Sequence, residues 1–284
     1  MRKQIEPVGG QAVGGGIVTE PEPMGSDKAP GFSSIALESL PATSEAAQIL
    51  VEHLFAQSDV SIPGISYAVT YRLAEGHAGG DIIDLYHFDN DSVAISIADI
   101  SGKGTQAAVH AALIKYGLRA YSSHGLAPEK AVRALDRLYL ENNAFERTES
   151  FASIFLGVVD PSRRMMTYTC AAHEPVLVMY ADGSVRVLDP TAPLIGVFDD
   201  QHHLFKQHFV ELRESALFVG TTDGITEARN AQGELYGMER LISVVRRHRD
   251  EPVGDIVDAL LSDALAFCDG IRRDDIAIIA ARFE

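Results

Sequence analysis

The segment GGDIIDLYHFDNDSVAISIADISGKG, residues 79–104, decides the fold. Two runs of alternating apolar residues flank the turn signal Asp89-Asn90-Asp91, and this pattern predicts a β-hairpin. Because side chains alternate along a strand, every second residue of each run lies on one shared face of the hairpin. The pairs predicted on that face are Asp81 with Asp99, Ile83 with Ile97, Leu85 with Ile95, and His87 with Val93. The face is therefore apolar through its middle and ends in two opposed carboxylates.

The opposed carboxylates, Asp81 and Asp99, indicate a cation site. Two carboxylates about 5 Å apart at the edge of a core repel each other, and one would normally take up a proton. A bound divalent cation removes this penalty, and carboxylate oxygens suit Mg²⁺ or Mn²⁺ better than zinc. Taken alone, the pair is equally consistent with two solvated aspartates at strand ends, because exposed aspartate is common.

Further aspartates stand at the mouths of other predicted strands. Asp223 follows the apolar run 216–220, and Asp274 and Asp275 open the last strand, 275–283. The end of a sheet can gather ligands from several strands, so these residues extend the candidate metal site.

The rest of the chain predicts an α+β fold. Hairpins outnumber strand–helix–strand units, which favours mostly antiparallel sheets with helices laid over them. Helices are predicted at 44–57, 104–121, 128–141, 238–247 and 253–267. Strands are predicted at 65–73, 81–88, 92–98, 151–159, 165–172, 176–180, 185–188, 216–220 and 275–283.

Two regions are distinguished by composition. Residues 1–44 are rich in glycine, proline and small residues, and they predict a flexible N-terminal tail that contains at most a short ordered piece. Residues 45–284 predict a single folded domain. The helix at 44–57, with Ser44 as its N-cap, precedes the first strand of that domain. We expect this helix to couple an upstream activator protein or a homodimer mate to the metal site.

Charge and cysteine content narrow the class of protein. The 284-residue chain carries a formal net charge of −16, which disfavours nucleic acid and anionic membrane as partners. Its basic run at 246–249 is best explained as a solvated helix end. No apolar stretch is long enough to span a membrane, and residues 1–10 do not resemble a signal peptide. The two cysteines are far apart in sequence, which predicts a reducing, cytoplasmic location.

Eight segments, in this order, resemble the type 2C (PPM) metal-dependent protein phosphatases, in particular the bacterial branch typified by SpoIIE and RsbU. They are GGDIID at 79–84, ADISGKGTQAA at 98–108, FASIFLGVVD at 151–160, CAAHEP at 170–175, APLIGVF at 192–198, TTDGITEARN at 221–230, LYGMERL at 235–241 and RRDDIAIIAARF at 272–283. The resemblance covers residues 45–284. It implies a four-layer α-β-β-α sandwich, in which two mostly antiparallel sheets are flanked by helices.

The resemblance also implies two Mn²⁺ or Mg²⁺ ions at the sheet ends. It assigns Asp99 to both ions, the Ile100 carbonyl to one of them, and Asp81 through its carboxylate or through waters. Asp223 and Asp274 are expected to hold the second ion, and Asp275 is the nearest competitor for the role of Asp274.

The implied activity is that of a protein serine/threonine phosphatase. A metal-bridging hydroxide attacks phosphoserine or phosphothreonine in line, so that Asp81, Asp99 and Asp223 are the catalytic carboxylates. The expected substrate is a phosphorylated signalling protein, an anti-sigma-factor antagonist of the STAS type. Ser101 stands where eukaryotic relatives have a histidine, which leaves the general acid unassigned, and His173 and Lys103 are weak candidates for it.

Four alternatives remain open at this stage. The string SGKGTQAA at 101–108 imitates a phosphate-binding loop, but Ile97 stands where that loop needs glycine. GGDIID resembles the loop of diguanylate cyclases without its acidic-Phe pair. His202, His203 and His208 suggest either a metal cluster or, with more support, a polar loop. A phosphatase-like scaffold that binds a signalling partner without catalysis is the strongest alternative from another class.

Overall fold

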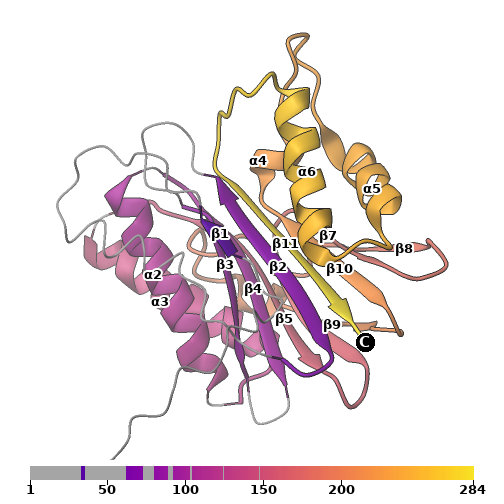
Figure 1. Ribbon diagram of the computed structural model, residues 1–284. Coiled ribbons are helices and arrows are strands. Elements are labelled where there is room, and N and C mark those ends of the chain that lie inside the picture. Colours follow the sequence, from indigo (N-terminus) through magenta and orange to yellow (C-terminus); the bar gives the residue numbers. More distant parts are fainter. Residues whose placement is uncertain are drawn as a thin grey trace, which may run out of the picture. The chain divides into compact units, whose positions relative to one another are not determined.

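The computed structural model describes residues 33–35, 62–72, 80–88, 92–102, 104–123, 125–146 and 148–284. Within these residues two β-sheets pack face to face, and helices cover both outer faces (Figure 1). The prediction of a four-layer α-β-β-α sandwich is therefore confirmed.

The first sheet has the strand order β1-β2-β11-β10-β7-β8. Its strands are β1 (Ser33–Ile35), β2 (Ile65–Arg72), β11 (Ile276–Phe283), β10 (Ala216–Thr221), β7 (Val176–Met179) and β8 (Val185–Leu188). All neighbouring pairs are antiparallel except β1 and β2, which are parallel. The strand β1 lies inside the predicted tail, and the predicted helix at 44–57 lies outside the described residues.

The second sheet is antiparallel throughout and has the strand order β3-β4-β5-β6-β9. Its strands are β3 (Ile82–His87), β4 (Val93–Ile100), β5 (Ala152–Asp160), β6 (Met165–Ala171) and β9 (His208–Glu211). In the β3–β4 hairpin, Ile83 pairs with Ile97, Leu85 with Ile95, and His87 with Val93. These pairs confirm the predicted register of the hairpin, although its turn lies outside the described residues.

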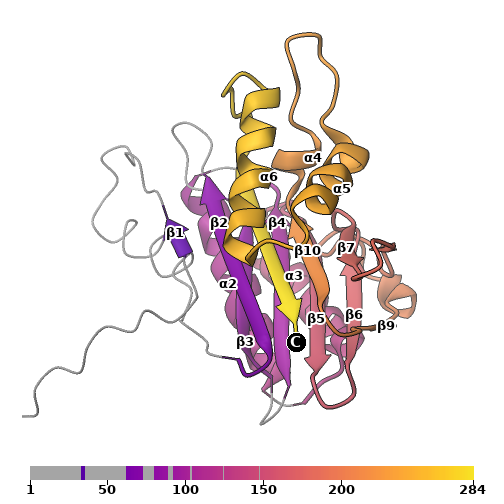
Figure 2. The same cartoon turned by 45° about the vertical axis from the view of Figure 1, so that its right-hand side comes forward.

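The helices divide between the two outer faces. α2 (Thr105–Ser122) and α3 (Pro128–Glu146) cover the second sheet, and α6 (Val253–Phe267) covers β2 and β11 of the first (Figure 2). α5 (Gly237–His248) packs beside α6 and ends in the basic run, as predicted. Within the described part of the chain, no helix combines the length and apolarity needed to cross a bilayer. Both cysteines are buried and free.

Four short elements were not predicted. They are β1, β9, the 3₁₀ helix Gln201–Leu204 and the four-residue helix α4 (Asp223–Thr226). Each is too short to show a hydrophobic period, so only tertiary pairing defines it.

Tyr71 links the two sheets by a polar contact. Its hydroxyl donates to the Ile83 carbonyl at 2.7 Å and accepts the Ile83 N–H at 2.5 Å. The strand β3 is an edge strand, and this hydroxyl forms hydrogen bonds with both backbone groups of Ile83. The contact fixes this edge of the second sheet at Ile83, two residues after Asp81.

The opposite face of β3 anchors α2. Asp84 is buried and receives two hydrogen bonds from Arg119, at 2.6 Å to Nε and 2.7 Å to Nη2. Lys115 lies 3.8 Å from the same carboxylate. This bidentate pair holds α2 against the strand that carries Asp81.

Replacing Tyr71 with phenylalanine is expected to destabilise the protein by about 2 kcal/mol, because it removes the two buried hydrogen bonds that the hydroxyl makes with the Ile83 backbone. The melting temperature should fall by about 4–8 °C in calorimetry. The matched control is Tyr116→Phe, since Tyr116 is 50% exposed on α2 and removal of its hydroxyl should leave the melting temperature unchanged. Equal melting temperatures for the two variants would contradict this role of Tyr71.

Candidate metal centre

The carboxylates of Asp81 and Asp99 stand at one end of the second sheet. Asp99 is in β4, and Asp81 immediately precedes β3. The antiparallel pairing ends at Ile82 with Ala98, so Asp81 and Asp99 are the next pair in that register. Asp81 is 4% exposed, whereas Asp99 is half-buried. The predicted opposition of two carboxylates at the end of an apolar face is thus present.

The carbonyl of Ile100 lies against the backbone of Gly80, the residue before Asp81. A Cβ added to Gly80 would lie 2.6 Å from the Ile100 carbonyl oxygen. Only a residue without a side chain allows this approach, so glycine at position 80 keeps the Ile100 carbonyl close to the segment that carries Asp81.

Asp223 comes from the first sheet. It opens α4 directly after β10, and the preceding residue, Thr222, fixes that junction to β11. The Thr222 hydroxyl accepts the Ala277 N–H at 3.0 Å, and the Thr222 N–H donates to the Ala277 carbonyl at 3.1 Å. This pairing sets where the chain leaves the sheet, and therefore where Asp223 stands.

Asp274 and Asp275 precede β11 at the same end of the molecule. Asp274 is exposed, and its Oδ1 accepts the Asp275 N–H at 3.0 Å. Asp275 is half-buried, and its Oδ2 accepts the N–H of Gly80 at 3.3 Å. Asp275 thus ties the start of β11 to the segment that carries Asp81.

Electrostatics show that these carboxylates from distant segments form one cluster. Burial raises the pKa of Asp81 well above its usual range, and the charge of Asp99 adds to the effect. Burial and then the charge of Asp274 raise the pKa of Asp99 to about 6. Burial and then the charges of Asp99 and Asp274 raise the pKa of Asp223 to about 7. The cluster is therefore poorly compensated by the protein itself.

The donor chemistry of this cluster fits a hard divalent cation. All the candidate ligands are oxygens, and Oδ2 of Asp81 is buried without a hydrogen-bond partner among the described residues. In the same part of the chain, no three His, Cys, Asp or Glu side chains come close enough together to make a ready-formed ligand set. The carboxylates are thus near enough for the charge of one to affect the pKa of a neighbour, but they do not converge on one point. Repulsion between like charges favours such a separation.

Sequence reasoning missed Glu174. Its charge raises the pKa of both Asp99 and Asp223, and its Oε2 accepts a hydrogen bond from Thr226 of α4 at 3.0 Å. It lies in the segment CAAHEP, whose position in the sequence gives no periodic or spacing signal that would have connected it to the aspartates.

The structure also bears on the general-acid candidates. His173 is buried, its Nδ1 lies 2.8 Å from the Ser153 hydroxyl, and burial lowers its pKa to about 4. It is therefore neutral near pH 7 and acts as a packing residue. The Ser101 hydroxyl accepts the Phe151 N–H at 2.9 Å, which gives Ser101 a structural contact. Lys103 lies outside the described residues.

Two of the alternative sites have no support in the structure. Ile97 is fully buried in the middle of β4, so the residues before Gly102 form a strand and not a phosphate-binding loop. His202, His203 and His208 do not gather. They contact, respectively, the carboxylate of Asp136, the Asp200 carbonyl and the ring of Tyr168.

The chain is similar to known phosphatases. The chain is 27% identical over 202 residues to the phosphoserine phosphatase RsbU of Bacillus subtilis, a match that covers 70% of this chain and 58% of RsbU. The chain spans 35% to 58% of the length of the curated relatives IcfG and RsbU.

Solved structures share the fold. The RsbU and RsbW domains of Rv1364c from Mycobacterium tuberculosis superpose with a TM-score of 0.68 at 24% identity, over 78% of this chain and 61% of that chain. The catalytic domain of the serine/threonine phosphatase PstP, solved with two manganese ions, superposes with a TM-score of 0.57 at 13% identity, over 77% of this chain and 97% of that chain.

The family model described as Stage II sporulation protein E (SpoIIE) matches residues 89–284, which include the strands β4, β10 and β11 around the acidic cluster. The chain therefore belongs to the SpoIIE family of PP2C-type phosphatase domains.

Proposed function

We propose that this protein is a metal-dependent protein phosphatase that hydrolyses phosphoserine or phosphothreonine on another protein. The observation that carries the proposal is the acidic cluster, in which Asp81, Asp99 and Asp223 come from three segments. Burial raises the pKa of all three, and the charge of Asp99 further raises the pKa of Asp81 and of Asp223. Such a cluster is unfavourable for folding and is explained by a cation that the carboxylates bind.

The proposed ligands are Asp81, Asp99, the Ile100 carbonyl, Asp223 and Asp274. Two ions, Mn²⁺ or Mg²⁺, are proposed because the PstP domain was solved with two manganese ions and RsbX was solved with magnesium. Divalent cations, when bound, supply a nucleophile from water at neutral pH and offset the charge of the phosphoryl oxygens.

Residues of the chain would position the ligands of this metal site. Asp81 and Asp99 would supply carboxylates from one sheet, and Asp223 would supply one from the other. Asp275, through its hydrogen bond to the Gly80 N–H, is a positioning residue for the Asp81 segment. The partly buried surroundings strengthen each charge interaction with a bound phosphoryl group.

The substrate class follows from the relatives. RsbU and RsbP of Bacillus subtilis are named phosphoserine phosphatases. We propose a phosphorylated anti-sigma-factor antagonist of the STAS type as the substrate and the cytoplasm as the location. A pull-down with the Asp223→Asn variant, which should retain bound phosphoprotein, tests the substrate class.

A phosphatase-like scaffold that binds its partner without catalysis remains the second candidate. It is favoured by one observation, that no three acidic side chains of the described residues converge on a common point. The measurement of Mn²⁺-dependent turnover separates the two functions, because only the phosphatase releases phosphate.

Replacing Asp223 with asparagine is expected to lower Mn²⁺-dependent hydrolysis of p-nitrophenyl phosphate at least about 100-fold, because it removes a negatively charged ligand. The matched control is Asp258→Asn on α6, which makes the same chemical change at an exposed site away from the cluster. Absence of Mn²⁺-dependent turnover in the unmodified protein would reject the phosphatase and favour the scaffold.

The metal-free protein is expected to lose stability as the pH rises from 5 to 8. An aspartate with a raised pKa keeps its proton in the folded state after the unfolded chain has released it, near pH 4. Its stabilising contribution is complete below about pH 4. That contribution is lost as the pH passes about 6 for Asp99 and about 7 for Asp223.

This pH dependence can be measured by calorimetry in the presence of a chelator. The Asp223→Asn variant should show a smaller fall in melting temperature between pH 5 and 8 than the unmodified protein, and Mn²⁺ should restore the melting temperature at pH 8. Identical pH profiles for the two proteins would show that Asp223 is not part of a strained acidic cluster.

A further inference from the structure

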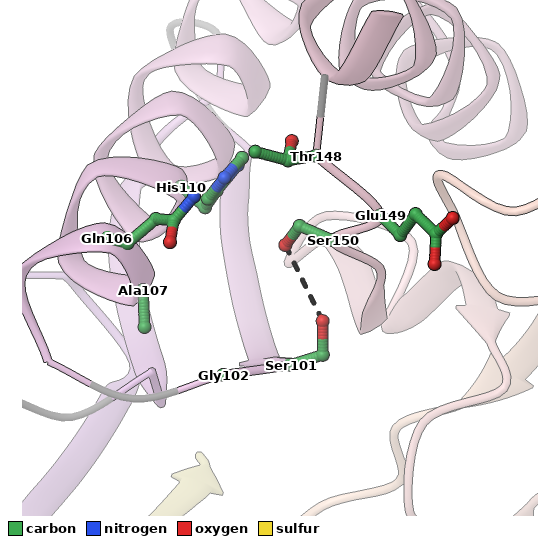
Figure 3. Close-up of a pocket in the computed structure, with 8 residues that line it drawn as sticks. All are labelled: Ser101, Gly102, Gln106, Ala107, His110, Thr148, Glu149 and Ser150. Atoms are coloured by element: carbon green, nitrogen blue, oxygen red, sulfur yellow. Dashed lines mark hydrogen bonds between the residues drawn. The ribbon is translucent and has the colours of Figure 1, made fainter. Parts of the chain in front are cut away.

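A cavity of about 350 Å³ lies between α2 and the segment before β5 (Figure 3). One wall is formed by the segment that follows β4 and by the first turns of α2, and the other by the segment before β5. The lining residues are Ser101, Gly102, Gln106, Ala107, His110, Thr148, Glu149 and Ser150. Ser101 is two residues from Asp99, so the cavity adjoins the place where we expect the phosphoryl group to bind.

The two walls of the cavity are tied together by hydrogen bonds. The Ser101 N–H donates to the Phe151 carbonyl at 2.9 Å, and the Ser101 hydroxyl accepts the Phe151 N–H. The Ser150 hydroxyl lies 2.8 Å from the Tyr139 hydroxyl, and Asn143 donates to the Ser150 carbonyl at 2.6 Å. The cavity is thus built into the fold and does not depend on a loose loop.

His110 is the unusual member of the lining. Its side chain is 1% exposed, and neither ring nitrogen has a hydrogen-bond partner among the described residues. The ring packs against Tyr139, with 5.2 Å between the ring centroids, and burial lowers its pKa. A buried polar group without a partner is costly, so an apolar residue would serve packing better at this position.

The path to this ring is short. Gln106 and Thr148 flank it (Figure 3), and Gln106 is exposed. Rotation of exposed side chains is fast, so a ligand in the cavity can gain access to the imidazole by displacing Gln106 or Thr148.

The lining chemistry selects an uncharged ligand that both donates and accepts hydrogen bonds. A neutral imidazole offers one donor and one acceptor, and the hydroxyls of Ser101, Thr148 and Ser150 can do both. Glu149 is exposed, and its carboxylate points away from His110 (Figure 3).

We propose that this cavity is a substrate subsite that binds an asparagine, glutamine, serine or threonine side chain next to the phosphorylated residue, with His110 as a hydrogen-bonding partner. This inference rests on the proposed phosphatase function and adds to it a sequence preference. The subsite would select among phosphoproteins, whereas a small phosphate ester would not reach it.

The test uses the full chain with Mn²⁺ and a set of seven-residue phosphoserine peptides in which each flanking position is varied in turn. Turnover of p-nitrophenyl phosphate by the same preparation serves as the reference for each variant. The unmodified protein should prefer an uncharged polar residue over alanine at one flanking position by at least about tenfold in kcat/KM, which one bidentate polar contact can supply.

Two variants then separate the subsite from the metal centre. His110→Phe keeps the packing against Tyr139 and removes both nitrogens, and Gln106→Leu changes an exposed part of the lining without a risk to folding. Both should reduce the preference to about twofold or less, after correction for p-nitrophenyl phosphate turnover. Val109→Ala, on an exposed position of the same helix, is the matched control and should retain the preference.

Each outcome decides a different point. A protein that hydrolyses p-nitrophenyl phosphate and the peptides without preference, or prefers a charged residue, would overturn the subsite and leave the proposed function intact. A preference that survives both variants would also overturn it, as would an equal loss on both substrates in His110→Phe, which would place His110 in the chemistry. A protein that hydrolyses neither substrate with Mn²⁺ would instead reject the proposed function.

Discussion

Repulsion among carboxylates that two packed sheets gather at one end is the constraint on which the rest of this structure depends. Asp81 and Asp99 come from the second sheet, and Asp223 comes from the end of β10 in the first. The cluster therefore exists only while the two sheets stay face to face. The apolar core between the sheets holds these groups close together, and burial, followed by the charge of neighbouring carboxylates, raises the pKa of Asp99 and Asp223.

Polar contacts in the surrounding fold serve to fix the positions of these carboxylates. The Tyr71 hydroxyl secures the edge strand β3, and Thr222 secures the exit from β10. Asp275 joins the two regions through the Gly80 N–H. These contacts are short and directional, and so they can hold acidic side chains at separations that the side chains themselves oppose.

The cavity beside the cluster gives this end of the molecule a second property. Under the proposed function, a small phosphate ester would need only the metal centre, whereas a phosphoprotein would also contact the lining residues Ser101, His110 and Ser150. The rate of phosphate release and the preference among substrates could then vary separately, because the proposed metal ligands lie at strand ends and the cavity lies between α2 and the segment before β5.

The sequence by itself determined the layers and much of the site. Alternation over 81–99 identified the hairpin and its register, because a slip of one residue would turn the apolar face to solvent. It also identified the aspartates, since each directly follows or opens a strong apolar run. Tertiary structure alone decided the features that have no periodic pattern of hydrophobic residues in the sequence. It added the strands β1 and β9 and the helix α4 and brought Glu174 to the cluster. It also buried His110 with neither ring nitrogen hydrogen-bonded to any residue that the structure describes. Those features depend on contacts between residues far apart in the chain, and the local pattern of hydrophobic and polar residues does not reveal such contacts.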